Sequence, residues 1–415
     1  MLLFWLGIGA AHAFCGTFVG PVGSAFENEA SQAILVRDGS HNTLSLANSF
    51  TGDVSDFGLL IPVPEILTAQ DVSVIDQELF AEVEAYSAPR LVSYSCDDFM
   101  SRSDSGAPNA EEGGSAHGVT VEESFTVGAY QIEVLSATGA GGLLDWLDAW
   151  GFDLPQSSLP VLNDYIQEDF YFLAARVTLS EVPAANAYLS PLQLRYSSES
   201  FTLPIRIGTT VSTGRQEVIL TVLNRGSEGK TSIANYPQAP LEDECMIPQE
   251  VVGYGSFYEE QLQDAFSKGI WVEEYSWSLG SCDPCSAEPP TPETLTALGV
   301  DWTDDDTWIT RIRARYTPEQ ATTDLALYQS GLQESSQVKY VLYDRYMENY
   351  FPVCGVGMVE DPEACPSDSG DPSAEDSGKG FDTPIRSACG CSTSSSPLPF
   401  LPLLALLFLR RKSCS

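Results

Sequence analysis

The feature that most constrains the fold of this chain is a series of short, strand-like segments joined by turns. The clearest example is the pair 32–37 and 42–48, which flanks Asp38-Gly39, a dipeptide that favours a tight turn between antiparallel strands. A parallel sheet would place a helix between successive strands, and the sequence shows no such regular alternation. We therefore expect an α+β fold that is mostly antiparallel β-sheet with a few short helices.

Further segments extend this pattern. Segment 57–63 is apolar without alternation and meets Pro62 and Pro64, which is typical of a buried strand stopped by proline. Segments rich in β-branched or aromatic residues follow as two expected pairs, 170–179 with 192–196 and 201–207 with 217–223. Helices are expected at 70–85, 142–150, 159–168 and 259–268, the second of which places Leu143, Leu144, Leu147 and Trp150 on one face.

The chain is strongly acidic. Its 58 acidic side chains outnumber 20 basic ones, and the net charge of −38 repels nucleic-acid phosphates and anionic lipid headgroups. We interpret the acidity as a solvated surface, because carboxylates bind calcium well only in a defined cage. Nucleic acid is therefore excluded as a partner, and the C-terminal tail is the only expected contact with a membrane.

Residues 1–13 have the composition of a signal peptide. They are apolar and end in an A-x-A pattern at Ala13, after which signal peptidase is expected to cleave. A lipoprotein signal would place a cysteine directly after the cut, whereas Phe14 separates Ala13 from Cys15. We therefore expect an exported α+β body over 14–354 without a lipid at its N-terminus.

The C-terminal region has a different composition. Residues 355–387 are rich in Asp, Glu, Ser, Gly and Pro, which is typical of a disordered acidic linker. The tail at 388–412 contains Cys389 and Cys391, an apolar run over 397–409 and a basic cluster. As a helix, the apolar run spans about 20 Å, short of the roughly 30 Å hydrocarbon core of a bilayer.

This order of cysteine motif, short apolar segment and basic cluster resembles the MYXO-CTERM sorting signal of certain Gram-negative bacteria. The resemblance implies that the tail holds the protein at the inner membrane until a sorting protease, the myxosortase, cuts near Cys389 or Cys391. The product is then released or displayed at the surface. The alternative is a short transmembrane helix that anchors the protein permanently, because the basic cluster fits either arrangement.

Ten cysteines in an exported chain point to disulfides, because the exterior of the cell envelope is oxidising. Seven of them lie between the two processed ends: Cys15, Cys96, Cys245, Cys282, Cys285, Cys354 and Cys365. Since seven is odd, one of them is expected to pair with a tail cysteine or to remain free.

The CDPC motif at 282–285 permits three interpretations: a structural disulfide, a redox-active dithiol, or half of a zinc site. A zinc site needs two more soft ligands, and no second CxxC occurs. A thioredoxin-type dithiol opens a helix after a strand, and although 269–279 fits the strand, prolines follow within 289–292. We expect a structural disulfide and keep the other two interpretations as alternatives.

The residues that usually carry catalysis are scarce. His12 leaves with the signal peptide, His117 lies in a polar insertion expected as a surface loop at 102–118, and His41 remains on the expected hairpin turn. No G-x-S-x-G motif, Walker loop or dinucleotide-binding motif accompanies them. The acidic cluster at 301–306 lacks the EF-hand pattern, so we expect a solvated turn. We assign no catalytic, cofactor-binding or metal-binding residues and expect no cofactor.

Several stretches together resemble a secreted bacterial family known only as domain of unknown function twenty-three thirty. They are residues 14–16, 31–38, 60–64, 86–91, 142–150, 203–208, 234–236, 282–285 and 309–316. The resemblance covers about 14–346 and implies export of one large body, but it implies no activity. Within this body, a break in the strand pattern at 226–240 indicates a soft internal boundary.

From these observations we expect a non-catalytic binding or structural module of the cell envelope or surface, released or attached to the membrane by its tail. Its partners are expected to be signal peptidase and a sorting protease during maturation, and an extracellular macromolecule or a polysaccharide afterwards. The alternatives are an extracytoplasmic redox protein that uses Cys282 and Cys285, and a hydrolase built on paired carboxylates.

Overall fold

The computed structural model of the chain describes most of the expected body. The described residues are 16–21, 26–27, 31–52, 56–93, 121–178, 187–211, 215–241, 245–246 and 253–343. All of them belong to one compact unit. The signal peptide at 1–13 with Ala13, the insertion at 102–118, the linker at 355–387 and the tail at 388–412 lie outside the described residues. So do Cys15, Cys96, Cys354, Cys365, Cys389 and Cys391.

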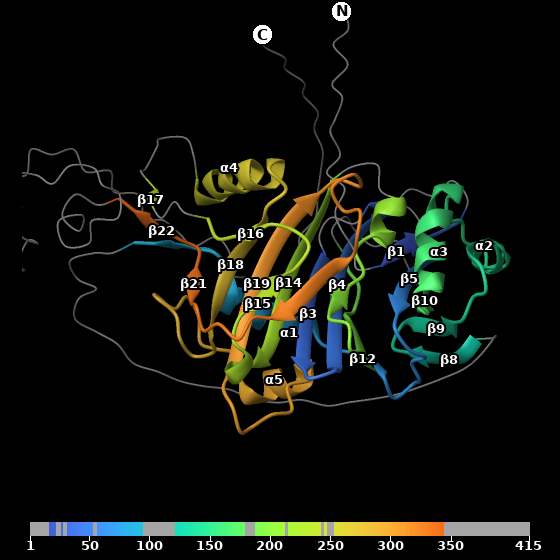
Figure 1. Cartoon of the computed structure of the whole chain (residues 1–415), viewed down its shortest axis with the longest axis horizontal. Helices are drawn as coiled ribbons and strands as arrows, with labels where there is room; N and C mark the ends of the chain where they lie inside the picture. Colours follow the sequence, from blue (N-terminus) through green and yellow to red (C-terminus); the bar gives the residue numbers. More distant parts are fainter. Residues whose placement is uncertain are drawn as a thin grey trace, which may run out of the picture. The chain divides into compact units, whose positions relative to one another are not determined.

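The larger of two main sheets runs through the middle of the described chain (Figure 1). Its main path, in spatial order, is β16 (Gln238–Ala239), β18 (Trp271–Ser278), β19 (Thr307–Tyr316), β14 (Gln216–Arg225), β3 (Ser31–Asp38), β4 (His41–Gly52), β12 (Leu192–Ser197) and β6 (Val72–Val74). The short strands β2 (Phe26–Glu27) and β11 (Ala187–Tyr188) pair with β4, and β21 (Ser336–Gln337) pairs with β18. All pairs are antiparallel except β3 with β14 and β16 with β18.

The smaller main sheet is antiparallel throughout. Its order is β1 (Thr17–Val19), β5 (Asp56–Val63), β10 (Tyr171–Thr178), β9 (Tyr130–Leu135) and β8 (Val121–Val127). Two minor sheets complete the described strands: antiparallel β13 (Thr202–Leu203), β20 (Leu325–Gln329) and β15 (Thr231–Ile233), and parallel β17 (Cys245–Met246), β22 (Lys339–Leu342) and β7 (Arg90–Val92).

The main core lies between the two main sheets. A single buried cluster combines alternate residues of both, such as Leu59 and Ile61 of β5 with Leu35 of β3 and Leu220 of β14. Side chains alternate between the two faces of a strand, so one face of each strand supplies this core. Since burying a large aliphatic side chain contributes about 1.5–3 kcal/mol, this cluster is the main source of stability.

Five α-helices of the described part cover the outer faces of the sheets (Figure 1). Helices α2 (Ala140–Ala149) and α3 (Leu159–Gln167) bury apolar side chains against the smaller sheet. Helices α1 (Gln77–Ser87) and α5 (Pro292–Leu298) share a buried cluster on the outer face of the larger sheet. Helix α4 (Tyr254–Ser267) covers the same face at β18. The order of layers is therefore helices, sheet, sheet, helices.

Local sequence explains where several of these elements begin and end. Helix α1 begins after Asp76, whose carboxylate accepts a hydrogen bond from the Glu78 amide at 2.9 Å. The Thr291 hydroxyl accepts from the Thr294 amide in the same way at the start of α5. Helix α5 ends at Gly299, which has a φ of +105° and closes the last turn with a left-handed backbone.

The mostly antiparallel α+β class is confirmed, and so is the hairpin at Asp38-Gly39. Asp38 pairs with His41 across a two-residue turn in which Gly39 has a φ of +59°. The apolar segment 57–63 is the buried strand β5, which ends at Val63 before Pro64.

The expected partners of the later strands were wrong. Strand β10 pairs with β5 and β9, β12 pairs with β4 and β6, and β14 pairs with β3 and β19. Segment 201–207 forms only the short strand β13 before a 3₁₀ turn at Ile207–Thr210. These strands bury side chains on both faces, so their sequences carry little information about which neighbour they join.

The expected helices at 142–150, 159–168 and 259–268 are α2, α3 and the later part of α4. The expected helix at 70–85 was wrong in its first part, because residues 72–74 form β6 and pair with β12. Only after the Asp76 cap does the chain turn into α1. No helix among the described residues combines the length and apolar character needed to cross a bilayer.

Candidate functional site

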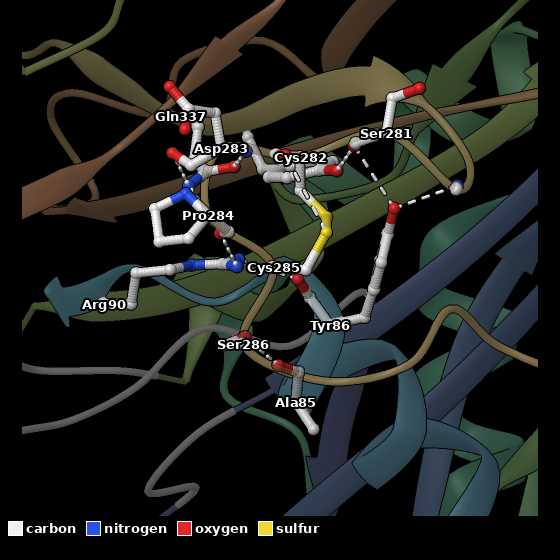
Figure 2. The surroundings of a disulfide bond; sticks show 12 residues. Ala85, Tyr86, Arg90, Ser281, Cys282, Asp283, Pro284, Cys285, Ser286 and Gln337 are labelled. Atoms are coloured by element: carbon white, nitrogen blue, oxygen red, sulfur yellow. Dashed lines mark hydrogen bonds between the residues drawn. A yellow bond between two sulfur atoms is a disulfide. The ribbon is translucent and has the colours of Figure 1, made fainter. Parts of the chain in front are cut away.

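The CDPC motif lies in the loop that follows β18 (Figure 2). Cys282 and Cys285 form a disulfide with their Cα atoms 5.0 Å apart, within the usual range for such bonds. The expected disulfide at this motif is therefore confirmed. In this state the two sulfurs are bonded to each other and offer no thiolate to a metal.

Several hydrogen bonds fix this loop to the end of α1 and the start of β7 (Figure 2). Arg90 donates from its guanidinium to the Pro284 carbonyl at 2.9 Å, and the Ser286 hydroxyl donates to the Ala85 carbonyl at 2.7 Å. The Tyr86 hydroxyl donates to the Ser281 carbonyl at 3.2 Å. The disulfide therefore closes a loop that is already attached to a helix, which is typical of a structural bond.

The setting of the motif differs from that of a thioredoxin-type dithiol. Helix α5 begins only at Pro292, so neither cysteine lies at a helix N-terminus, where a helix dipole would favour the thiolate. Cys285 is exposed and Cys282 is partly buried. Cys245 of β17 is also disulfide-bonded, with a partner outside the described residues.

A surface hollow, which we call the acidic cleft, lies where the β3–β4 turn, β12 and the loop before β19 meet. Its volume is about 930 Å³. The carboxylates that line it belong to Asp38, Glu65, Asp71, Asp301, Asp305 and Asp306, and the cleft also contains His41 and Arg195. The fold thus brings the hairpin histidine and the acidic cluster at 301–306 to one place, although they are far apart in the sequence.

One wall of the acidic cleft is fixed by Arg225. Its guanidinium donates to both carboxylate oxygens of Asp38 at 2.9 Å and to Asp304 at 2.6 Å, and it lies 5.4 Å from the centre of the Trp302 ring. The hydrogen bonds from Arg225 hold the pKa of Asp38 below its ordinary value. The same contacts raise the pKa of Arg225.

The acidic cluster at 301–306 lies in the loop before β19 and binds the 3₁₀ turn at Gly226–Glu228, which follows β14. Asp305 accepts hydrogen bonds from the Ser227 hydroxyl and, at 2.9 Å, from the Ser227 amide. These bonds lower the pKa of Asp305. Asp301 and Asp306 are exposed, and their carboxylates accept no hydrogen bond from any other described residue. Nowhere in the described ranges do three or more His, Cys, Asp or Glu side chains gather as metal ligands would.

The opposite wall of the acidic cleft is also held by local hydrogen bonds. Glu65 accepts from the Ser197 amide at 2.6 Å, and Asp71 accepts from the amide and hydroxyl of Thr68 at 2.8 and 2.7 Å. A glycoside hydrolase needs one carboxyl group with a raised pKa to act as general acid. Asp38 and Asp305 have the opposite shift, so they remain ionised at neutral pH and do not suit that role.

A second polar feature was missed by the sequence analysis. Arg311, Arg313 and Arg315 occupy alternate positions of β19 and project from the outer face of the larger sheet. We call them the arginine row. They lie between the sheet and the helices α1 and α4, which supply Glu84 and Glu259 to the row.

Arg311 is the most buried member of the arginine row, with 2% of its surface exposed. Its Nε donates to Glu274 of β18, and its two terminal nitrogens donate to Glu84 of α1 at 2.6 and 3.0 Å. The Tyr258 hydroxyl of α4 donates to Glu274 at 2.5 Å. Burial alone would lower the pKa of Arg311, but the two carboxylates more than offset this and raise it.

The other two arginines share Glu217 of β14. Arg315 donates to Glu217 at 2.7 Å and to Glu259 at 2.5 Å, and Arg313 pairs with both Glu217 and Glu274. Glu217 and Glu274, the two buried carboxylates of this network, are thus matched by guanidinium groups. Buried ion pairs of this kind fix the relative positions of the elements that carry them. We therefore interpret the arginine row as a structural network that joins α1 and α4 to the sheet.

Strand β18 contains a bulge beside the arginine row, which places both Glu274 and Tyr275 on the outer face of the sheet. The register against β19 shifts between Glu273 and Tyr275, so Glu274 is an extra residue on this strand. Glu273 faces the opposite side of the sheet. Its carboxylate forms an ion pair with Lys230 at 2.8 Å and accepts a hydrogen bond from the Gln238 side-chain amide at 2.6 Å. A sequence pattern of alternate residues does not reveal such a bulge, although alternate arginines in ITRIRARY are a visible signal of a charged strand face.

Comparison with known proteins places most of the chain in one family. Residues 9–328 match the family described as "Uncharacterized protein conserved in bacteria (DUF2330)", which confirms the family resemblance. No curated protein sequence matches the chain.

Solved structures that are similar to the chain include three of baculovirus P35, each over 75% of this chain. A mutated P35 after caspase cleavage shares 11% identity with a TM-score of 0.25 and is covered over 100% of its length. The caspase-8/P35 complex shares 10% with a TM-score of 0.25, and a further structure of P35 shares 12% with a TM-score of 0.23, each covered over 96%. TM-scores this low support neither a shared fold nor a shared role.

Proposed function

The chain belongs to the uncharacterized bacterial family DUF2330, and on this premise we propose that it is a non-catalytic binding module of the cell exterior. Its acidic cleft receives a positively charged segment of another macromolecule. The family description assigns no activity, so the proposal depends on the site itself.

The observation that carries this proposal is the acidic cleft. Its volume of about 930 Å³ is near the upper end of the usual range for ligand sites, about 300–1,000 Å³. Hydrogen bonds hold carboxylates on both walls, so a partner does not have to order them on binding. Fixed negative charge favours a cationic partner and steers its approach, whereas anionic partners are repelled.

The exterior location rests on the two ends of the chain. Signal peptidase removes 1–13 after Ala13, and the tail at 388–412 is sorted with a cut near Cys389 or Cys391. The acidic linker at 355–387 separates the body from the membrane until that cut, or permanently where the tail stays as an anchor. Disulfides support this location, because Cys245, Cys282 and Cys285 are all oxidised and such bonds persist in oxidising compartments.

The proposal is tested by removing charge from the acidic cleft. The double variant Asp301→Asn with Asp306→Asn removes two exposed carboxylates on which no described hydrogen bond depends. Exposed charge pairs contribute up to about 1 kcal/mol each, so the affinity for a fluorescent decalysine peptide should fall about fivefold to thirtyfold. Fluorescence anisotropy at low and physiological salt measures the change.

A matched control is available on α2. Asp145→Asn with Asp148→Asn makes the same change in net charge on exposed positions of a helix that does not line the acidic cleft. The control should leave the affinity for decalysine within about twofold, because charges beyond a Debye length of about 8 Å are screened. An equal loss in both double variants would show that the peptide responds only to overall charge and would remove the case for a specific cleft.

Thiol–disulfide exchange at Cys282 and Cys285 is the second candidate function. The exposure of Cys285 favours it, because an attacking thiolate needs access to one sulfur. The contacts from Arg90, Tyr86 and Ser286 favour a structural bond instead. Titration with a glutathione redox buffer separates the two, since a bond that resists reduction excludes a redox role.

A further inference from the structure

A second hollow, which we call the aromatic cavity, lies where β18 begins and β19 ends, beside the residues that follow α4. Its volume is about 320 Å³. Its wall includes the rings of Tyr236, Trp271 and Tyr316, and its rim includes Lys268, Arg315 and Gln320. None of its lining residues belongs to the acidic cleft.

The three rings form a row with Trp271 in the middle. Its ring centre lies 5.7 Å from that of Tyr236 and 5.7 Å from that of Tyr316, with interplanar angles of 32° and 20°. The Tyr236 hydroxyl donates to the Thr323 carbonyl at 2.7 Å and accepts from the Thr323 amide at 3.1 Å, which fixes the outer ring. Trp271 and Tyr316 are buried, at 3% and 4% exposure, so the partly exposed Tyr236 is the ring that the cavity offers to a ligand.

The charges at the rim are already neutralised by neighbours. Arg315 is bound by Glu217 and Glu259, and Lys268 pairs with Asp264. None of the described residues that line the aromatic cavity is a carboxylate, and the positive charges of Lys268 and Arg315 at the rim disfavour a cation. An anion is disfavoured as well, because Arg315 and Lys268 are already paired with carboxylates and the chain has a net charge of −38. The cavity is therefore suited to a neutral ligand.

Gln320 supplies an oriented hydrogen-bond donor. Its side-chain oxygen accepts from the Thr317 amide at 2.9 Å, which leaves the side-chain nitrogen to donate. That nitrogen lies 3.9 Å from where a Cβ on Gly269 would be. Gly269 has a φ of +70°, so this position favours glycine and the space beside the amide stays open.

We infer that the aromatic cavity binds one neutral sugar residue of a polysaccharide. A sugar ring has apolar C–H faces, which suit the partly exposed Tyr236 ring. It also has hydroxyl groups at its edge, which can accept from the Gln320 amide and donate to the Ser267 hydroxyl at the rim. A volume near the lower end of the usual range for ligand sites, about 300–1,000 Å³, suits a single ring of a longer chain. That the protein meets this ligand outside the cell rests on the export proposed above. That the ligand is a neutral sugar rests only on the residues of the cavity.

Binding to a printed array of neutral and uronate-containing oligosaccharides tests the inference. The full-length protein should be retained by neutral glycans, and Tyr236→Ala and Gln320→Glu should each weaken the affinity for the best of them at least tenfold. Gln320→Glu keeps the oxygen that accepts from Thr317 and replaces only the donor, so it changes the site with little change in shape. Tyr328→Ala is the control, because Tyr328 is a tyrosine that is 48% exposed and does not line the cavity.

Retention by neutral glycans that is lost in both site variants and kept in Tyr328→Ala would support the inference. Retention by no neutral glycan, or equal retention by the wild type and both site variants, would overturn it. The thermal unfolding midpoint of each variant shows whether it is folded. Asp301→Asn with Asp306→Asn should leave glycan binding unchanged, so the acidic cleft and the aromatic cavity can fail independently.

Discussion

Arg311 carries its charge almost completely out of contact with water. Moving an isolated ion into a protein interior costs several kcal/mol, and this cost is offset only when partners surround the charge. Glu274 and Glu84 bind opposite sides of the guanidinium, and Glu274 is itself fully buried. The pair is therefore more sensitive to the loss of one member than an exposed ion pair would be.

We predict that Arg311→Met lowers the free energy of unfolding by about 3–5 kcal/mol, because the buried Glu274 carboxylate loses its closest ion pair and keeps only the longer contact to Arg313 and the hydrogen bond from Tyr258. Chemical denaturation at neutral pH measures this change. Lys268→Met is the control: Lys268 is 58% exposed and pairs with Asp264 on the surface, so its loss should cost less than about 1 kcal/mol. Equal effects of the two substitutions would contradict the structural role given to the arginine row.

The turn after α5 depends on a single residue type. Gly299 ends the helix at a φ of +105°, and a Cβ placed there would lie 2.6 Å from the Thr43 hydroxyl of β4. The close approach lets α5 pack on the strand and lets the following loop lead into the acidic cleft.

Gly299→Ala should therefore destabilise the protein through both backbone strain and the contact with Thr43, by about 2–4 kcal/mol in total. Gly331→Ala is the matched control, since Gly331 also has a positive φ of +69° but has open space at its Cβ position. It should lose only the backbone contribution, about 1 kcal/mol. Thermal and urea unfolding compare the two, and a larger loss at Gly331 would contradict the packing described here.

Short-range signals predicted elements well where one residue type decides the local geometry. The turn at Gly39, the helix α3 and the disulfide between Cys282 and Cys285 follow this rule. Apart from the β3–β4 hairpin, strand pairing did not follow from the sequence. One example is β14, which joins β3 in parallel across a long stretch of chain. Both strands are buried on two faces, and such strands have no polar alternation that would indicate a neighbour.

At the scale of the whole molecule, the polar sites are assembled from distant segments. The partners of the arginine row come from α1, α4, β14 and β18. The acidic cleft likewise joins Asp38 to the cluster at 301–306. The residue types were visible in the sequence, but their distances depend on sheet order, which local patterns do not encode.

We propose that this body functions outside the cytoplasm, and three features of the chain support the proposal. An acidic surface repels nucleic acid, Cys245, Cys282 and Cys285 are oxidised, and the ends resemble routing signals. The cysteines and the two ends have covalent consequences in the mature protein: sulfurs that do not react with an alkylating reagent, and changed ends.

Mass spectrometry of the protein isolated from its native cells, alkylated without prior reduction, tests whether the body is exported. We predict a mature chain that begins at Phe14, a peptide in which Cys282 and Cys285 remain joined, and a C-terminus cut near Cys389 or Cys391 or a tail retained intact. A chain that still begins at Met1 and is alkylated at Cys245, Cys282 and Cys285 would contradict the account.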